Sequence, residues 1–126
     1  MMPMLTRLRV LMVEDQEDLR ELIAAALREY GVAVTTAADG VAAQALIDSD
    51  EEFDVVFTDV RMPNGVCGVT LAEAVGRTRP NARVILTSGF ASAQLPPLPP
   101  GVAFLQKPYR LKQLFAILTA IATEVQ

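Results

Sequence analysis

Short apolar runs alternate along this chain with segments in which apolar residues recur every three or four positions. The runs at 8–13 and 54–58 have the composition of strands buried on both faces of a parallel sheet, and we interpret all five runs as strands. They lie at residues 8–13, 32–36, 54–58, 82–87 and 102–105. The helical spacing predicts helices at residues 16–30, 41–49, 69–78 and 111–125. This alternation is typical of an α/β domain in which helices cover both faces of a parallel sheet.

The apolar positions of each helix predict which of its faces packs on the sheet. In the first helix we expect an inward stripe made of Leu19, Leu22, Ile23, Ala26, Leu27 and Tyr30. The second helix has a weaker pattern, in which Ala45 and Leu46 are expected to point inward. We interpret these stripes, and the Leu and Ile stripe of the last helix, as core rather than as cofactor-binding surfaces.

Prolines interrupt the alternation between the fourth and fifth strands, where another helix is due. Four of the five residues at 96–100 are proline. Proline lacks a backbone N–H and its ring clashes with the preceding turn, so a regular helix is excluded there. We expect at most a single helical turn over 91–95, followed by a rigid extended loop. A proline-rich docking segment is the less favoured alternative.

The composition limits the classes of protein to which the chain can belong. With 126 residues and 52% apolar content, we expect one compact domain, 1–126, and not a disordered chain. The net charge of -4 and the scattered Lys and Arg residues argue against a general nucleic-acid-binding surface. No continuous segment of the sequence reaches the roughly 18 apolar residues of a membrane span. Its start lacks the uninterrupted apolar core of a signal peptide. We therefore expect a cytoplasmic protein.

The cysteine and histidine content of the chain excludes several kinds of functional site. Cys67 is the only cysteine, and the chain has no histidine. Disulfides, zinc sites built on histidine and histidine-dependent catalytic triads are therefore excluded. We interpret Cys67 as a small space-filling residue.

Charged and hydroxyl side chains follow four of the apolar runs. In the order of the runs they are Glu14-Asp15, Asp59, Thr87-Ser88 and Lys107. Because the carboxyl ends of parallel strands meet at one edge of a sheet, we expect these groups to lie close together. Open α/β sheets bind their ligands at that edge.

The two acids after the first run repel each other unless a cation or solvent offsets their charge. Asp15 could instead cap the helix that follows, with Glu17 and Asp18 complementing the helix dipole. Capping explains one acid, but it leaves Asp59 at a neighbouring strand end unexplained. Carboxylate oxygens and water are the ligands that Mg²⁺ prefers in proteins.

Asp59 follows an apolar strand, which would place its carboxylate at the rim of the sheet. An aspartate can accept a phosphoryl group and form an acyl phosphate. The transfer needs a metal to offset charge repulsion, and hydroxyl or cationic groups on the phosphoryl oxygens. Thr87 can supply the hydroxyl and Lys107 the cation. Each residue has a simpler structural role open to it, but the four strand ends together favour phosphoryl chemistry.

The same motifs resemble those of response-regulator receiver domains, the phosphoacceptor half of two-component signalling. The resemblance covers nearly the whole chain. Its carriers are Val13-Glu14-Asp15, Thr58-Asp59-Val60-Arg61-Met62-Pro63, Leu86-Thr87-Ser88-Gly89 and Gln106-Lys107-Pro108. It implies a flavodoxin-like, doubly wound, five-stranded parallel sheet of order 2-1-3-4-5, here with a shortened or missing fourth helix.

The resemblance also implies roles for individual residues. Asp59 would be phosphorylated by a histidine kinase or a histidine phosphotransfer protein, with contributions from Lys107 and Thr87. Mg²⁺ would be bound by Asp15, Asp59, the backbone carbonyl of Arg61 and, through a water, Glu14. Thr87 and Phe104 match the family's switch pair, whose rearrangement would relay the phosphorylated state to a partner. A cis peptide bond is expected before Pro108.

Residues 63–68 and 101–108 more specifically resemble receivers attached to hybrid histidine kinases. The proline stretch at 96–100 departs from the family, because the fourth helix normally lies there and contributes to output or dimerisation. A stand-alone regulator and the receiver piece of a larger hybrid kinase both stay open, as does weak self-association. The cognate kinase and the downstream output are not indicated by the sequence.

A signalling switch of this kind would catalyse only its own phosphorylation and dephosphorylation, so we do not expect an enzyme. Two other functions are alternatives to it. The first is an aspartyl-phosphate hydrolase, but such enzymes place a second acid where this chain has Arg61. The chain is also short for a substrate-binding cap. The second is a receiver-like domain that no longer accepts phosphate. The complete set of Glu14, Asp15, Asp59, Thr87 and Lys107 argues against it.

Overall fold

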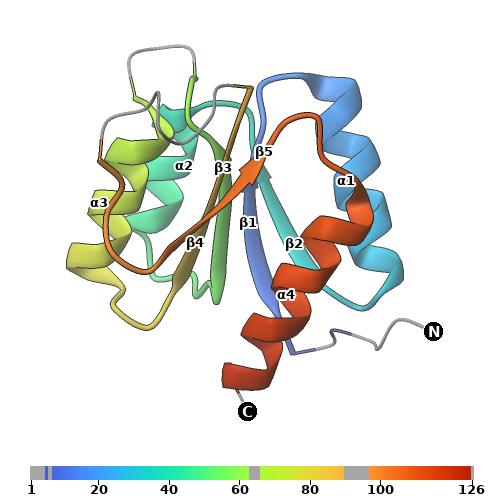
Figure 1. Ribbon diagram of the computed structural model, residues 1–126. Coiled ribbons are helices and arrows are strands. Elements are labelled where there is room, and N and C mark those ends of the chain that lie inside the picture. Colours follow the sequence, from blue (N-terminus) through green and yellow to red (C-terminus); the bar gives the residue numbers. More distant parts are fainter. Residues whose placement is uncertain (1–4, 6, 63–65, 90–96, 126) are drawn as a thin grey trace.

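The computed structural model describes residues 5, 7–62, 66–89 and 97–125, and Figure 1 shows their arrangement. A parallel sheet lies at the centre of the molecule, with its strands in the order β2-β1-β3-β4-β5. The strands are β1 (Arg9–Val13), β2 (Ala33–Ala37), β3 (Val55–Asp59), β4 (Arg83–Ser88) and β5 (Val102–Gln106). The predicted five-stranded order 2-1-3-4-5 is confirmed.

Helices cover both faces of the sheet, as a flavodoxin-like fold requires. They are α1 (Glu17–Glu29), α2 (Gly40–Ile47), α3 (Gly68–Thr78) and α4 (Leu111–Val125). In Figure 1, α1 and α4 lie on one side of the sheet and α2 and α3 on the other. No helix in the described ranges has both the length and the apolar character needed to cross a bilayer.

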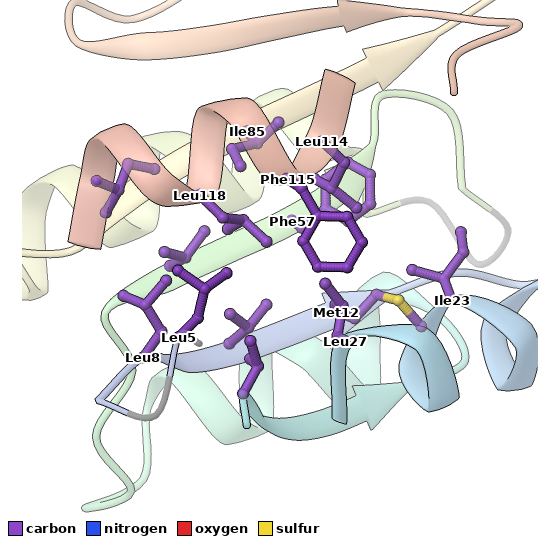
Figure 2. Close-up of a cluster of buried hydrophobic side chains, with 14 of the residues drawn as sticks. Leu5, Leu8, Met12, Ile23, Leu27, Phe57, Ile85, Leu114, Phe115 and Leu118 are labelled. Carbon is purple, nitrogen blue, oxygen red and sulfur yellow. The ribbon is translucent and has the colours of Figure 1, made fainter. Parts of the chain in front are cut away.

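Two hydrophobic clusters follow from this layering. The first packs α1 and α4 against the sheet around Met12, Phe57 and Leu114 (Figure 2). The second packs α2 and α3 against the opposite face and includes Leu11 and Val56. Neighbouring strand residues therefore point into different clusters. This explains why the central strands are apolar at every position instead of alternating.

The region between β4 and β5 departs from regular alternation, as predicted. No helix is found there in the residues that the structure describes, which are Gly89 and 97–101. The helical turn expected at 91–95 lies outside the described residues. Leu98, from the proline stretch, packs against the α2–α3 side of the core, as Val102 and Phe104 do. A proline-flanked leucine thus covers part of the sheet face.

Two expectations about helix faces were wrong. Leu22 was expected in the core of α1 but is 63% exposed, because the buried stripe of that helix is centred on Ile23 and Leu27. In α2, Ala45 is exposed, and the inward face is made by Gly40, Ala43 and Ile47. Leu46 is partly buried against the core. A short helix rich in alanine carries too little contrast between its faces for sequence spacing to define the inward one.

Candidate functional site

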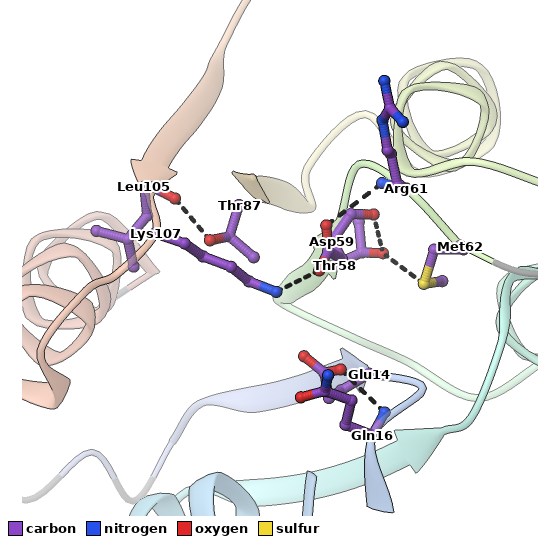
Figure 3. Close-up of polar contacts among 9 residues, drawn as sticks. All are labelled: Glu14, Gln16, Thr58, Asp59, Arg61, Met62, Thr87, Leu105 and Lys107. Carbon is purple, nitrogen blue, oxygen red and sulfur yellow. Dashed lines mark hydrogen bonds and ion pairs between the residues drawn. The ribbon is translucent and has the colours of Figure 1, made fainter. Parts of the chain in front are cut away.

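The register of the sheet brings the predicted residues to one edge. Asp59, the last residue of β3, is aligned with Thr87 of β4, and Thr87 is aligned with Leu105 of β5. Val13 of β1 is aligned with Thr58, so Glu14 follows β1 beside the end of β3. Figure 3 shows the side chains of Glu14, Asp59, Thr87 and Lys107 at the ends of these strands. The expected convergence of the strand ends is therefore found.

Asp59 is held by contacts from two directions. Its Oδ2 atom is 2.5 Å from Nζ of Lys107, and the side chains are 12% and 30% exposed respectively. Its Oδ1 atom accepts a hydrogen bond of 3.3 Å from the backbone N–H of Arg61. The backbone N–H of Lys107 donates to the carbonyl of Ser88, which fixes the segment after β5. The carboxylate is thus oriented but still reached by solvent.

Glu14 is a buried acid beside this pair, only 5% exposed. Burial raises its pKa, and the neighbouring Asp15 and Asp59 raise it further, although the N–H of Gln16 and the charge of Lys107 oppose them. For Lys107, burial acts to lower the pKa, but the hydrogen bond and charge of Asp59 outweigh it, so the pKa is raised. Negative charge is therefore in excess at this edge, and an added cation would be stabilised.

Asp15 does not cap α1, which was the structural alternative for this residue. The N-cap of α1 is Gln16, which makes no side-chain capping hydrogen bond. Instead, the Glu14 carboxylate accepts a 3.0 Å hydrogen bond from the N–H of Gln16. The exposed Asp15 side chain lies at the turn between β1 and α1, next to the acidic edge.

The carboxylate oxygens at this edge are the type of ligand that a hard divalent cation prefers, although they are not gathered into a complete coordination shell. Among the described residues, no three or more His, Cys, Asp or Glu side chains are gathered as a metal-binding group. Mg²⁺ does not require such a cage, because it binds through one or two carboxylates and keeps several waters. Glu14, Asp15 and Asp59 are the acids from which those ligands would come.

The switch residues predicted from the sequence occupy different environments. Thr87 is buried, and its Oγ1 atom donates a 2.6 Å hydrogen bond to the carbonyl of Leu105 (Figure 3). Phe104 is partly buried against the α2–α3 side of the core. The peptide bond between Lys107 and Pro108 is cis, as predicted.

Gly68 lies directly against the backbone of Asp59, a contact that the sequence did not indicate. This first residue of α3 donates from its N–H to the carbonyl of Val60, at 2.8 Å. A Cβ atom at Gly68 would lie 2.3 Å from the carbonyl oxygen of Asp59. Only a residue without a side chain lets the helix approach the end of β3 so closely. The sequence signal was a glycine nine positions after an aspartate, which is weak by itself.

Tyr109 is a further residue of the site that sequence reasoning missed. Its ring packs edge-on against Phe57, with centroids 5.9 Å apart. Burial first, and then the charges of Glu14 and Asp59, raise the pKa of its hydroxyl to about 12. Tyr109 also lines a cavity of about 630 Å³ beside Lys107, whose wall includes the exposed Leu22. The aromatic residue directly after Lys107-Pro108 was the available signal.

We expect Tyr109 to ionise near pH 12, compared with about 10 for a free tyrosine. A raised pKa favours the neutral hydroxyl in the folded state. The stability that it contributes is therefore complete below about pH 10 and lost as the pH rises to about 12. The chain has two tyrosines, so ultraviolet absorbance titration of a Tyr30→Phe variant reports Tyr109 alone.

Adding Asp59→Asn to that Tyr30→Phe variant removes one of the charges that act on Tyr109. The pKa should then fall, while burial keeps it above the ordinary value. If both variants titrate at the same pH, the hydroxyl does not sense the charge of Asp59.

Known proteins resemble the chain over most of its length. The family model of the response regulator receiver domain matches residues 10–119. The sensor kinase CckA of Brucella abortus is 38% identical over 109 residues, which are 83% of this chain and 11% of that kinase. The response regulator receiver protein CpdR of the same organism is 31% identical over 109 residues, 84% of this chain and 89% of CpdR.

A solved structure agrees with these matches. The receiver domain from the hybrid histidine kinase CckA is 32% identical to the chain and superposes on it with a TM-score of 0.76. The superposition covers 90% of this chain and 98% of that domain. The chain thus spans a small part of the Brucella abortus CckA kinase, but nearly all of the solved CckA receiver domain and most of CpdR.

Proposed function

Because this chain belongs to the response-regulator receiver family, we propose that Asp59 accepts a phosphoryl group from a phosphohistidine on a partner protein. The observation that carries the proposal is the placement of Asp59 at the carboxyl edge of the sheet, paired with Lys107 and still reached by solvent. In two-component signalling the partner is a histidine kinase or a phosphotransfer protein. The phosphorylated domain would then relay its state to a second partner.

The transfer exchanges one bond to phosphorus for another. A carboxylate oxygen of Asp59 attacks the phosphorus, the bond from phosphorus to the donor's histidine nitrogen breaks, and an acyl phosphate forms. Lys107, now 2.5 Å from Asp59, would remain close enough to neutralise an oxygen of the transferred group. The excess of negative charge at this edge otherwise opposes the approach of a phosphate.

Mg²⁺ is the cofactor that we propose for this step, in line with the family. Asp15, Asp59 and the backbone carbonyl of Arg61 would hold it directly, and Glu14 through a water. Bound there, Mg²⁺ offsets the repulsion between the carboxylates and the phosphoryl oxygens. The proximity of Glu14 to Asp15 and Asp59 supports this assignment: burial and then these two acids raise the pKa of Glu14, so a bound cation would relieve their repulsion.

We propose that the hydrogen bond from Thr87 to Leu105 opposes the phosphorylated state. The Thr87 hydroxyl has one proton to donate, and at present the carbonyl of Leu105 accepts it at 2.6 Å. Donation to a phosphoryl oxygen on Asp59 requires that bond to break. Phe104 directly precedes Leu105 in β5, so movement of Thr87 away from Leu105 would change the packing around Phe104. Phosphorylation would thus bias a surface at some distance from the site.

The surface beside the site supports a protein as phosphoryl donor. Leu22 is a large apolar side chain with 63% exposure, and it borders the cavity next to Lys107. Leu19, Tyr109 and Leu111 line the same cavity, and an apolar surface of several residues is of the kind at which proteins make contacts. We propose that the donor protein covers this surface during the transfer. The domain would work in the cytoplasm as a switch, with any catalysis confined to its own phosphorylation and dephosphorylation.

Phosphorylation by a small donor tests this function directly. Incubation with acetyl phosphate and Mg²⁺ should add the mass of one phosphoryl group to the intact protein, measured by mass spectrometry. A chelator of divalent cations should prevent the addition. Labelling that is unaffected by the chelator would contradict the role of Mg²⁺, and the absence of any labelling by acetyl phosphate or phosphohistidine proteins would contradict the function.

A further inference from the structure

Arg20 of α1 reaches back to the turn that carries the acidic residues. Its Nη1 atom donates a 2.9 Å hydrogen bond to the backbone carbonyl of Glu14. The backbone N–H of Arg20 also donates to the carbonyl of Gln16, at 2.9 Å. The side chain thus spans the turn at 14–16 and holds it from the helix side.

The position of this arginine is unfavourable for the helix itself. Arg20 is the fourth residue of α1, close to the end where the helix dipole favours negative charge. Glu17 and Asp18 follow that preference, and Arg20 does not. A residue that departs from a local rule usually has a role elsewhere in the structure. For Arg20 that role is its bond to the carbonyl of Glu14.

The Arg20 side chain bonds the carbonyl of Glu14, whereas the other polar groups of that residue are bonded elsewhere. The N–H of Glu14 is bonded to the carbonyl of Ala37 on β2, and its carboxylate accepts from the N–H of Gln16. Gln16 contributes no side-chain cap to α1. The peptide between Glu14 and Asp15 carries the carbonyl to which Arg20 donates. Its orientation sets the direction in which the Asp15 side chain leaves the backbone.

We propose that Arg20 is a positioning residue that holds the turn at 14–16 in the orientation needed to bind Mg²⁺. The inference rests on the proposed function, because it assumes that Asp15 and Glu14 serve the cation. Arg20 does not touch the metal; it acts through the backbone of Glu14. Groups that orient metal ligands commonly affect metal affinity almost as strongly as the ligands do.

This role and a purely electrostatic one have opposite consequences. As a nearby positive charge, Arg20 would repel a cation, so its removal would strengthen Mg²⁺ binding. As a positioning residue, its removal would weaken binding, because the carbonyl of Glu14 would lose the hydrogen bond that holds it to α1. The sign of the change in the Mg²⁺ dissociation constant therefore separates the two.

The experiment compares Mg²⁺ binding by isothermal titration calorimetry in the wild type, Arg20→Met, Arg20→Lys and Arg28→Met. Arg28 is the matched control: it lies on the same helix and donates to a backbone carbonyl, that of Val34 at 3.0 Å, away from the acidic edge. Arg20→Met should weaken Mg²⁺ binding about tenfold. Arg20→Lys keeps a donor and should recover part of the affinity, and Arg28→Met should bind as the wild type does.

The thermal midpoint of each variant without Mg²⁺ separates positioning from general loss of structure. The inference requires Arg20→Met to lose more affinity for Mg²⁺ than Arg28→Met does. The comparison is made with the loss of thermal stability in each variant taken into account. Unchanged or tighter binding in Arg20→Met would overturn it, as would an equal loss in both variants. A wild type that fails to bind Mg²⁺ would instead remove the proposed cofactor, and this inference with it.

Discussion

Replacing Asp59 with asparagine is expected to abolish phosphorylation while leaving the domain folded. The amide has nearly the shape of the carboxylate but lacks the anionic oxygen that must attack phosphorus. Lys107 keeps Glu14 as a nearby counter-charge, so the loss of its pair with Asp59 does not isolate it. Labelling by acetyl phosphate and Mg²⁺ should fall to background, as measured by the mass of the intact protein.

Asp54 provides the control for this experiment. It is also a buried acid, 8% exposed, and it precedes the same strand that Asp59 ends. Its carboxylate is bound by the backbone and guanidinium of Arg9, at the opposite end of β3 from the candidate site. Asp54→Asn should lower stability but retain labelling. Equal labelling of Asp59→Asn and the wild type would refute the assignment of the phosphoacceptor.

Gly68→Ala is expected to destabilise the protein by about 3 kcal/mol, at the upper end of what overpacking usually costs. The new Cβ would lie 2.3 Å from the carbonyl oxygen of Asp59 and 3.0 Å from its carbonyl carbon. Both atoms belong to the backbone of a buried central strand, so neither can move aside as a flexible side chain would. The start of α3 must therefore shift away from β3. Urea denaturation measures the change.

Gly76→Ala is the matched control on the same helix. A Cβ at Gly76 would meet nothing within 4 Å, so the substitution adds helix propensity without a clash. It should stabilise the protein by roughly 0.5–1 kcal/mol. The same chemical change is thus expected to have opposite signs at two positions of α3. Similar effects at both positions would show that the close approach of Gly68 to Asp59 is unimportant for stability.

Much of the site could be predicted from the sequence because its residues follow strands. Glu14, Asp59 and Thr87 each come at or just after the end of an apolar run, and parallel strands align such ends at one edge. Lys107 follows the edge strand by the same rule. The supporting residues had no comparable signal. Gly68 and Arg20 act through the backbone of other segments, which no periodicity within their own helix encodes.

The sequence by itself determined the class of fold, the strand order expected of the family and the set of charged groups at one edge. These follow from local patterns, since an apolar run or a helical stripe reports on burial within its own segment. Only the tertiary structure decided that Leu22 faces solvent, that Gly68 touches the backbone of Asp59 and that Tyr109 packs against Phe57. The reason is physical: these properties depend on distances between segments far apart in the chain, and packing of the whole domain sets those distances.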